Sequence, residues 1–123
     1  MAGAALSALR AITLKVIVPL MEKRRPHYSL SDAQAEVARV GIASFTRTAR
    51  VGARAMGLTE AEALAVIACI TPRCFYKSMT TFADHRVWQD VYHAPCPGGI
   101  TAYVKLTMTA AEGVQVVIQF KEK

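Results

Sequence analysis

Residues 75–93 read FYKSMTTFADHRVWQDVYH, and this stretch decides the fold class. Two runs within it, residues 75–82 and 86–93, are rich in Tyr, Trp, Thr and Val, and only three residues separate them. Such residues favour extended backbone, and so short a separation is typical of a β-hairpin. The sequence therefore predicts two antiparallel strands in the second half of the chain.

A second hairpin is predicted after the loop at residues 95–99, which reads PCPGG. Its strands are residues 102–109 and 114–121, joined by a turn at residues 110–113. Apolar and mostly polar side chains alternate along both strands, so the predicted sheet has one apolar face and one polar face. This alternation assigns Ile118 and Phe120 to the apolar face and Val117 to the polar face.

Upstream of the hairpins the pattern becomes helical. Ser31 and Asp32 are suited to cap a helix over residues 33–40, and Gly41 is suited to end it. Residues 42–45 are a short strand or a connector.

Two more helices follow. One covers residues 46–56 and ends at Gly57, and the next begins with a capping box in which Thr59 precedes Glu62 by three residues. An apolar stripe on this third helix is expected to face the core, and it consists of Ala61, Leu64, Ala65 and Cys69.

Helices that precede an antiparallel sheet indicate an α+β domain, with N-terminal helices packed on one face of a mostly antiparallel C-terminal β-sheet. A length of 123 residues fits one domain, and 53% hydrophobic residues exclude a disordered tail. Residues 1–20 differ in composition, and Arg10 and Lys15 interrupt their apolar run, which argues against a membrane span or a secretory signal. We expect a dispensable extension there, or else a weak targeting segment, followed by a single domain of residues 21–123 that could start at Met21.

The chain is basic, with 15 Lys and Arg against 9 Asp and Glu, a net charge of +6 and a pI near 9.6. This surplus favours phosphate-rich or acidic partners. Arg47, Arg50 and Arg54 recur at helical spacing and should share one face of the second helix. The three cysteines form no CxxC pair, which indicates neither a disulfide framework nor a zinc knuckle and fits a reducing cytoplasm.

Metal chemistry and covalent catalysis have little support in the sequence. His27, His85 and His93 lie far apart, so neither a metal site nor a cofactor is predicted. A nucleophile needs a nearby histidine base, and only Ser78 with His85 or Cys96 with His93 could supply one.

The polar face of the predicted sheet suits a different chemistry, the cleavage of a phosphodiester without a metal. Lysine can stabilise the charge that develops on the phosphate, and tyrosine or lysine can transfer a proton. In RNA the 2′-hydroxyl is the nucleophile, and an exposed aromatic ring can stack on an unpaired base. The alternative is a solvated basic face that binds nothing. The residues concerned are Tyr76, Lys77, Gln89, Tyr103, Lys105, Gln119 and Lys121.

Most of these residues belong to longer strings: FYKSMTT at 75–81, DH at 84–85, WQDVY at 88–92, YVK at 103–105 and FKEK at 120–123. Together with MEKR at 21–24 and PH at 26–27, the strings resemble the MqsR (motility quorum-sensing regulator) family of bacterial toxins. The resemblance spans residues 21–123, densely in the last fifty and loosely between 31 and 74.

The resemblance implies a RelE-like toxin that cleaves messenger RNA independently of the ribosome, at GC-containing triplets such as GCU. It also implies a cytoplasmic bacterial protein with no cofactor and no membrane association. Its partner would be an MqsA-like antitoxin that binds metal and DNA. The catalytic positions carried over are Lys77, Gln89, Tyr103 and Lys121, and Tyr76, Met79 and Lys105 are expected to bind RNA.

Departures from the family pattern are mild. Phe82 and Ala83 replace a Tyr-Ser pair, His93 stands where an arginine is familiar, and the loop at residues 95–101 differs. The different loop is expected to affect which RNA sequence is preferred more than whether RNA is cleaved. A second hypothesis stays open at this point, namely a non-catalytic basic module that acts through a protein partner or nucleic acid.

Overall fold

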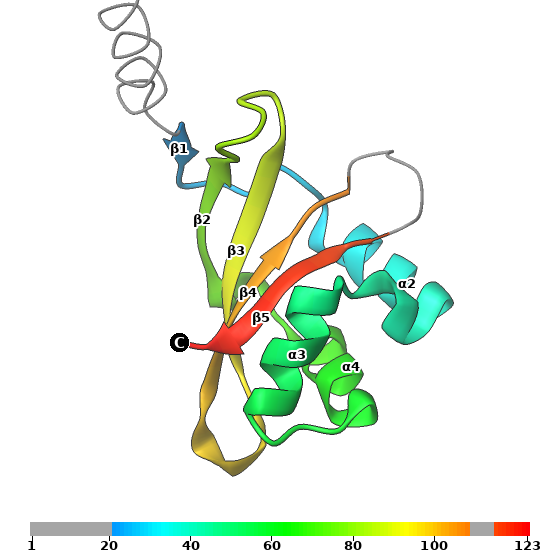
Figure 1. The fold of residues 1–123 in the computed structure, drawn as a ribbon. Helices are drawn as coiled ribbons and strands as arrows, with labels where there is room; N and C mark the ends of the chain where they lie inside the picture. The colour runs from blue at the N-terminus through cyan, green and yellow to red at the C-terminus, as the bar shows by residue number, and fades with distance from the viewer. Residues whose placement is uncertain (1–20, 109–114) are drawn as a thin grey trace, which may run out of the picture.

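A computed structural model of the protein describes residues 21–108 and 115–123. The predicted extension and the turn of the second hairpin lie outside the described residues. Three helices pack against one face of a five-stranded antiparallel sheet with the order β1-β2-β3-β4-β5 (Figure 1). The predicted α+β class, with helices first and sheet second, is confirmed.

Both predicted hairpins are present. The first consists of β2 (Phe75–Thr80) and β3 (Trp88–Pro95), and the second of β4 (Thr101–Leu106) and β5 (Val117–Glu122). The additional strand β1 (Glu22–Lys23) pairs with β2 and was not predicted. Two residues are too few to show a period in the sequence, so only pairing with a distant strand reveals β1.

The helices are α2 (Leu30–Val40), α3 (Arg47–Ala55) and α4 (Glu60–Cys69). The capping box predicted for α4 is confirmed, because the Thr59 side chain accepts from the Glu62 N–H and the Glu62 side chain accepts from the Thr59 N–H. The N-cap of α3 was not predicted: Thr46 lies just outside the helix, and its side chain accepts from the Ala49 N–H.

The predicted start of α2 is wrong. Ser29, in extended backbone, caps the helix by accepting a hydrogen bond from the Asp32 N–H at 3.2 Å. Ser31 and Asp32 already lie in the first turn, because the helix starts at Leu30 rather than at Ala33.

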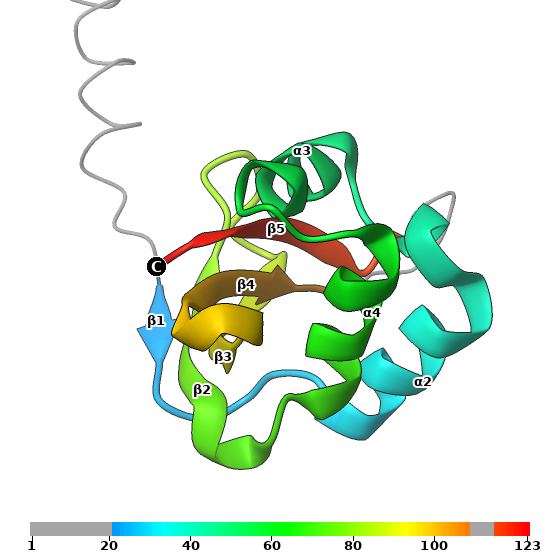
Figure 2. The same ribbon diagram turned by 90° about the horizontal axis from the view of Figure 1, so that it is seen from below.

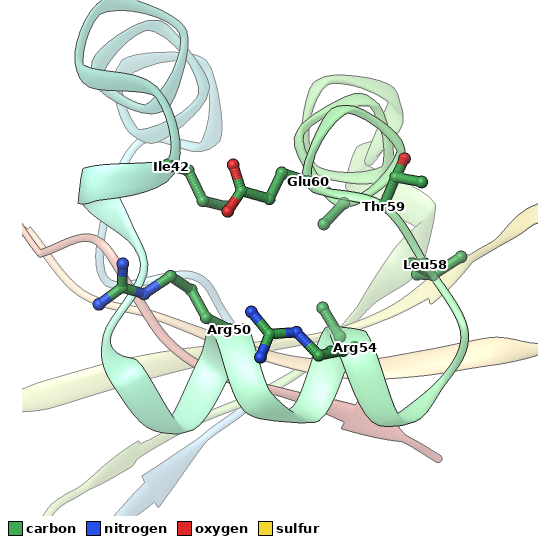
Figure 3. A pocket seen from close by; sticks show the side chains of 8 residues that line it. Ile42, Arg50, Arg54, Leu58, Thr59 and Glu60 are labelled. Carbon is green, nitrogen blue, oxygen red and sulfur yellow. The ribbon is translucent and has the colours of Figure 1, made fainter.

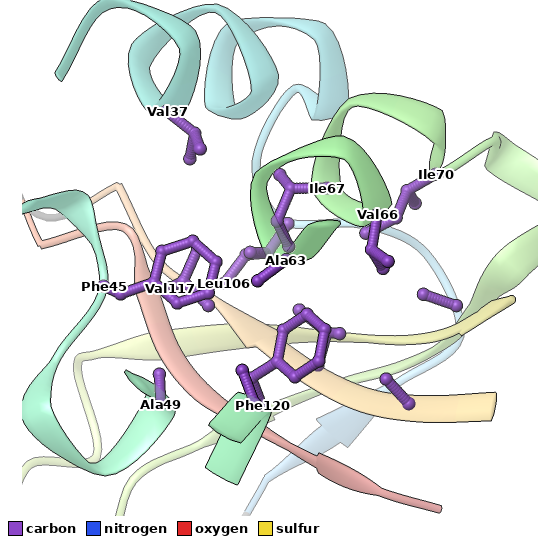
Figure 4. Close-up of a cluster of buried hydrophobic side chains, with 14 of the residues drawn as sticks. Val37, Phe45, Ala49, Ala63, Val66, Ile67, Ile70, Leu106, Val117 and Phe120 are labelled. Atoms are coloured by element: carbon purple, nitrogen blue, oxygen red, sulfur yellow. The ribbon is translucent and has the colours of Figure 1, made fainter. Parts of the chain in front are cut away.

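The face that α4 buries also differs from the prediction. Ala63, Val66 and Ile67 pack into the core (Figure 4). Cys69, in contrast, is exposed. Ala61 and Ala65 are likewise exposed, and Leu64 is half-buried. Apart from its two glutamates, every residue of α4 is apolar, so the sequence does not single out one stripe.

A β-bulge in β5 explains why strict alternation fails there. Leu106 pairs with Val117 but Lys105 pairs with Gln119, so Ile118 is an extra residue in β5. Val117 therefore points into the core and is fully buried, and the prediction that placed it on the polar face is wrong.

The free edge of β5 is covered by the segment that leads into α3. A 3-10 turn at Gly41–Ser44 is followed by Phe45, which forms an isolated parallel bridge with Val117. The Thr46 N–H donates to the Val117 carbonyl at 2.9 Å, and α3 then runs along β5 (Figure 2). Residues 42–45, predicted as a short strand or a connector, thus form a turn that ends in a single bridge to β5. They cover the edge of the sheet, which would otherwise be open to pairing with another chain.

The core lies between α4, α3 and the inner face of the sheet (Figure 4). Phe45 and Phe120 are both buried, with ring centroids 5.9 Å apart. Tyr92 is 1% exposed, and its ring meets Phe75 edge-on at 5.6 Å.

Buried Tyr92 should make the protein sensitive to alkali. Burial, with a smaller contribution from the Asp90 charge, raises the pKa of Tyr92 from 10.0 to about 12. Its protonated form therefore stabilises the folded state fully below pH 10, and this stabilisation is lost as the pH rises through about 12. We expect a loss of about 3 kcal/mol in the free energy of unfolding across this range, measurable by urea denaturation.

In Tyr92→Phe this alkaline loss should be smaller by that amount. Tyr76→Phe, which alters an exposed tyrosine, is the matched control and should behave like the parent. Equal alkaline losses in Tyr92→Phe and the parent would contradict the assignment to Tyr92.

Candidate active site

Tyr103 on β4 lies at the centre of the sheet face turned away from the helices. In the strand register it is opposite His93 on β3 and Lys121 on β5. The Lys121 Nζ is 5.3 Å from the Tyr103 ring centroid, and the Lys105 Nζ is 5.8 Å from it. Two ammonium groups thus approach one half-buried phenol ring. We call the face of the sheet that carries Tyr103, Lys105 and Lys121 the open face.

Lys77 joins this group from β2, one row along the sheet. It lies opposite Val91, which in turn lies opposite Lys105. Val91 is fully buried although the helices pack on the other face, and its register partners on both sides are these two lysines, whose aliphatic stems are suited to cover apolar surface. Burial, assisted by the positive charges of Lys121 and Lys77, lowers the pKa of Lys105.

Lys77 is held in place by an acidic partner from β1. Its Nζ lies 2.7 Å from a carboxylate oxygen of Glu22, and this hydrogen bond raises the pKa of Lys77. The lysine is therefore charged at neutral pH and suited to contact a phosphate. An RNA phosphate would compete with Glu22 for the same ammonium group.

The position of β1 depends on a buried carboxylate under the sheet. Asp90, 1% exposed, accepts hydrogen bonds from the backbone N–H groups of His27 and Tyr28, each at 2.9 Å. The Tyr28 hydroxyl donates to the Trp88 carbonyl at 2.9 Å. These bonds hold the segment after β1 against β3 and thereby keep Glu22 beside Lys77.

The Tyr103 hydroxyl is suited to donate a proton. Burial raises the pKa of Tyr103, and the positive charge of Lys77 opposes that rise. The phenol is accordingly protonated at neutral pH and cannot serve as the base. A hydroxyl among cations can instead protonate an oxygen that leaves with negative charge.

The rings of Tyr76, His93 and Tyr103 form an aromatic row across β2, β3 and β4. The Tyr76 and His93 rings are stacked with centroids 4.4 Å apart, and His93 is 6.0 Å from Tyr103. Tyr76 is 41% exposed and therefore open to a base. His93 was not among the predicted site residues. Its even spacing from Gln89 on one strand is the signal that could have identified it.

Gln89 and Met79 lie on the open face but further along it. They are opposite each other in the register of β2 and β3. Gln89 is four residues from His93, or roughly 13 Å along the strand. The structure therefore brings Lys77, Tyr103 and Lys121 together, with Gln89 at a separate position on the same face.

The two conceivable nucleophile–histidine pairs do not form. Ser78 is fully buried and donates to the Gln89 carbonyl at 3.4 Å, while His85 is exposed in the loop after β2. The Cys96 thiol points to the Ala94 carbonyl at 3.5 Å, and burial raises its pKa, so it is not a reactive thiolate. Within the described residues, no three His, Cys, Asp or Glu side chains gather where they could hold a metal ion.

The predicted row of arginines lies on the helical side of the molecule. Arg47, Arg50 and Arg54 of α3 line one hollow together with Glu60 of α4. Arg50 and Arg54 also border a second hollow between α3 and α4 (Figure 3). The row is thus a basic surface separate from the open face of the sheet.

In the part of the chain that the structure describes, no helix is long and apolar enough to cross a membrane.

Comparison with known proteins identifies the same family that the sequence strings resemble. The profile of the family described as "Motility quorum-sensing regulator, toxin of MqsA" matches residues 25–122. The mRNA interferase toxin MqsR of Escherichia coli (strain K12) is 40% identical over 103 residues, which cover 84% of this chain and all of that protein. The chain, with its lysine- and tyrosine-bearing open face, therefore belongs to the MqsR family of toxins.

Proposed function

We propose that this chain is an endoribonuclease that cleaves messenger RNA without a ribosome or a metal ion, at GC-containing triplets such as GCU. The observation that carries the proposal is the position of Tyr103 within reach of three lysines. Lys105 and Lys121 flank its ring, and the charge of Lys77 acts on its hydroxyl. The relative from Escherichia coli, named an mRNA interferase toxin, supports the same activity.

The proposed reaction is an internal transfer within the RNA. The 2′-oxygen attacks the adjacent phosphorus and loses its proton, which ends in solvent water, and the bond from phosphorus to the 5′-oxygen breaks. The positive charges of Lys77 and Lys121 stabilise the extra negative charge on the phosphate oxygens. Tyr103 gives its proton to the departing 5′-oxygen. The products are a 2′,3′-cyclic phosphate and a 5′-hydroxyl.

The remaining residues of the open face are proposed to bind the RNA around the cut. Tyr76 stacks on an unpaired base. Gln89 lies too far along β3 to share a phosphate with Tyr103, so we assign it to a flanking base. Met79 lies opposite Gln89 and contributes an apolar contact to that base, and Lys105 contacts phosphate.

As a toxin of a type II toxin–antitoxin system, the chain would act in the bacterial cytoplasm and be neutralised by tight binding of a cognate antitoxin. The family description names a toxin of MqsA, which supports an MqsA-like partner. That this partner binds metal and DNA is part of the proposal.

Cleavage of an RNA that contains GCU triplets, in the presence of EDTA, tests the proposed function. We expect cleavage to proceed unchanged without divalent ions and to yield a cyclic phosphate at the 3′-end of each upstream product. A requirement for a divalent ion, or a 5′-phosphate on the downstream product, would contradict the mechanism. Toxicity in cells that survives loss of the sheet lysines would favour a non-catalytic binding module instead.

A further inference from the structure

One acidic side chain interrupts the basic open face of the sheet. Of the carboxylates that the structure describes, Glu22 on β1 is the one that lies on this face, 2.7 Å from the Lys77 Nζ. Four of the others belong to α2 and α4, and Asp90 is buried under the sheet. Asp84 pairs with an arginine in the loop after β2, and Glu122 is opposite the inward-facing Ala102. A carboxylate repels the phosphates of RNA, so the position of Glu22 calls for a function other than binding phosphate.

Glu22 begins a row of three side chains that crosses the open face. It is opposite Met79 in the register of β1 and β2, and Met79 is opposite Gln89 in the register of β2 and β3. Neighbouring strands lie close together, so the backbones of Glu22 and Gln89 are roughly 10 Å apart, with Met79 between them. A half-buried thioether thus lies between a carboxylate and an amide. A flat base placed over Met79 would present its polar edges to Glu22 and Gln89.

We propose that Glu22 recognises the guanine of the GC-containing triplet, accepting hydrogen bonds from the N1–H and the 2-amino group of a base that lies over Met79. This inference rests on the proposed function. An ionised carboxylate only accepts hydrogen bonds, and guanine is the RNA base with two adjacent donors on its Watson–Crick edge. Adenine, cytosine and uracil would each turn at least one lone pair towards the carboxylate. Gln89, on the other side of Met79, can donate its amide N–H to the guanine O6 or N7.

The contact with Lys77 prepares Glu22 for this role. The hydrogen bond from Lys77 lowers the pKa of Glu22, so the carboxylate is ionised at neutral pH. The ammonium group engages one carboxylate oxygen, and an RNA phosphate that competes for the ammonium would leave both oxygens to the base. The Glu22 side chain is 45% exposed, which leaves it open to a base. Guanine would therefore be held beside the phosphate that Lys77 contacts.

Inosine, which is guanine without the 2-amino group, tests the proposal with the full chain in EDTA. The substrates are short RNAs with a single GCU site, in which the guanine is kept or replaced by inosine. The parent should lose about 10-fold to 100-fold in kcat/KM on the inosine RNA, as expected for one lost hydrogen bond to a charged group. Glu22→Gln should cleave the inosine RNA at least as fast as the guanine RNA, because its amide N–H2 opposes the 2-amino group. Glu36→Gln, the matched control on a carboxylate that pairs with Arg39 of α2, should keep the parent preference.

A third RNA, with adenine in place of the guanine, separates recognition of the base from the positioning of Lys77. The glutamine amide accepts from the adenine amino group and donates to its N1, so Glu22→Gln should favour adenine. We expect the ratio of kcat/KM on the adenine RNA to that on the guanine RNA to rise about 10-fold or more over the parent. If Glu22 served only to position Lys77, the substitution would slow the cleavage of all three RNAs by one common factor.

Two results would overturn the inference alone. One is a parent that cleaves the guanine and inosine RNAs equally well. The other is a folded Glu22→Gln protein that loses cleavage of all three RNAs equally or completely, which would assign Glu22 to the positioning of Lys77. No cleavage at GCU by the parent would instead overturn the proposed function and this inference together.

Discussion

Tyr103→Phe is expected to lower the rate of RNA cleavage by roughly 100-fold to 10,000-fold while the protein remains folded. The substitution removes only the hydroxyl that donates to the leaving oxygen and leaves the ring between Lys105 and Lys121 in place. Because this proton is transferred in the transition state, kcat should fall while KM changes little. Single-turnover cleavage and RNA binding, measured on the same preparation, check both expectations.

Tyr76→Phe is the matched control on the same face. It removes a phenolic hydroxyl but keeps the stacking ring, so it should cleave at close to the parent rate. Lys77→Ala and Lys121→Ala should each lose about 100-fold to 1,000-fold in rate, as expected for removal of one group that stabilises transition-state charge. If Tyr103→Phe, Lys77→Ala and Lys121→Ala all cleave like the parent, the site is not on this face.

Gly52→Ala should destabilise the protein strongly, although alanine normally favours a helix. A Cβ atom added at Gly52 would lie 1.8 Å from the Phe120 carbonyl oxygen, which belongs to the backbone of β5 and cannot rotate away. Helix α3 would have to move off the edge of the sheet, disrupting the bridge of Phe45 and the hydrogen bond of Thr46. Overpacking of this kind costs about 1–3 kcal/mol and sometimes more, which outweighs a gain of about 1 kcal/mol in helix propensity.

Thermal and urea denaturation measure this effect, and Gly52→Val should be worse than Gly52→Ala because its side chain is larger. Val51→Ala is the control at the neighbouring exposed position of α3, and it should change the free energy of unfolding by less than about 0.5 kcal/mol. A Gly52→Ala protein as stable as the parent would show that α3 does not press against β5 as described.

The shared face of the candidate site was predictable because it follows from alternation along single strands, whereas the catalytic roles were implied only by the family resemblance. Lys77, Tyr103 and Lys121 lie on strands whose two-residue period separates inward from outward side chains, and antiparallel pairing then places them on a common face. The role of Glu22 was not predictable, because its contact with Lys77 joins residues 55 positions apart through a strand only two residues long. His93 was not predicted as a site residue, because the contacts and the pKa of a single histidine depend on its neighbours across the sheet.

The sequence by itself determined the local elements of this protein. Thr46, Thr59 and Glu62 cap their helices through contacts three residues away, and the hairpins follow from runs of strand-forming residues that succeed one another in the chain. Only the tertiary structure decided which side of α4 is buried and where β5 bulges. An almost entirely apolar helix can bury any of its sides, and a bulge arises from the fit of one strand to its partner and to α3. Long-range packing determines both features, and residues far apart in the sequence, such as Gly52 and Phe120, meet only once the chain has folded.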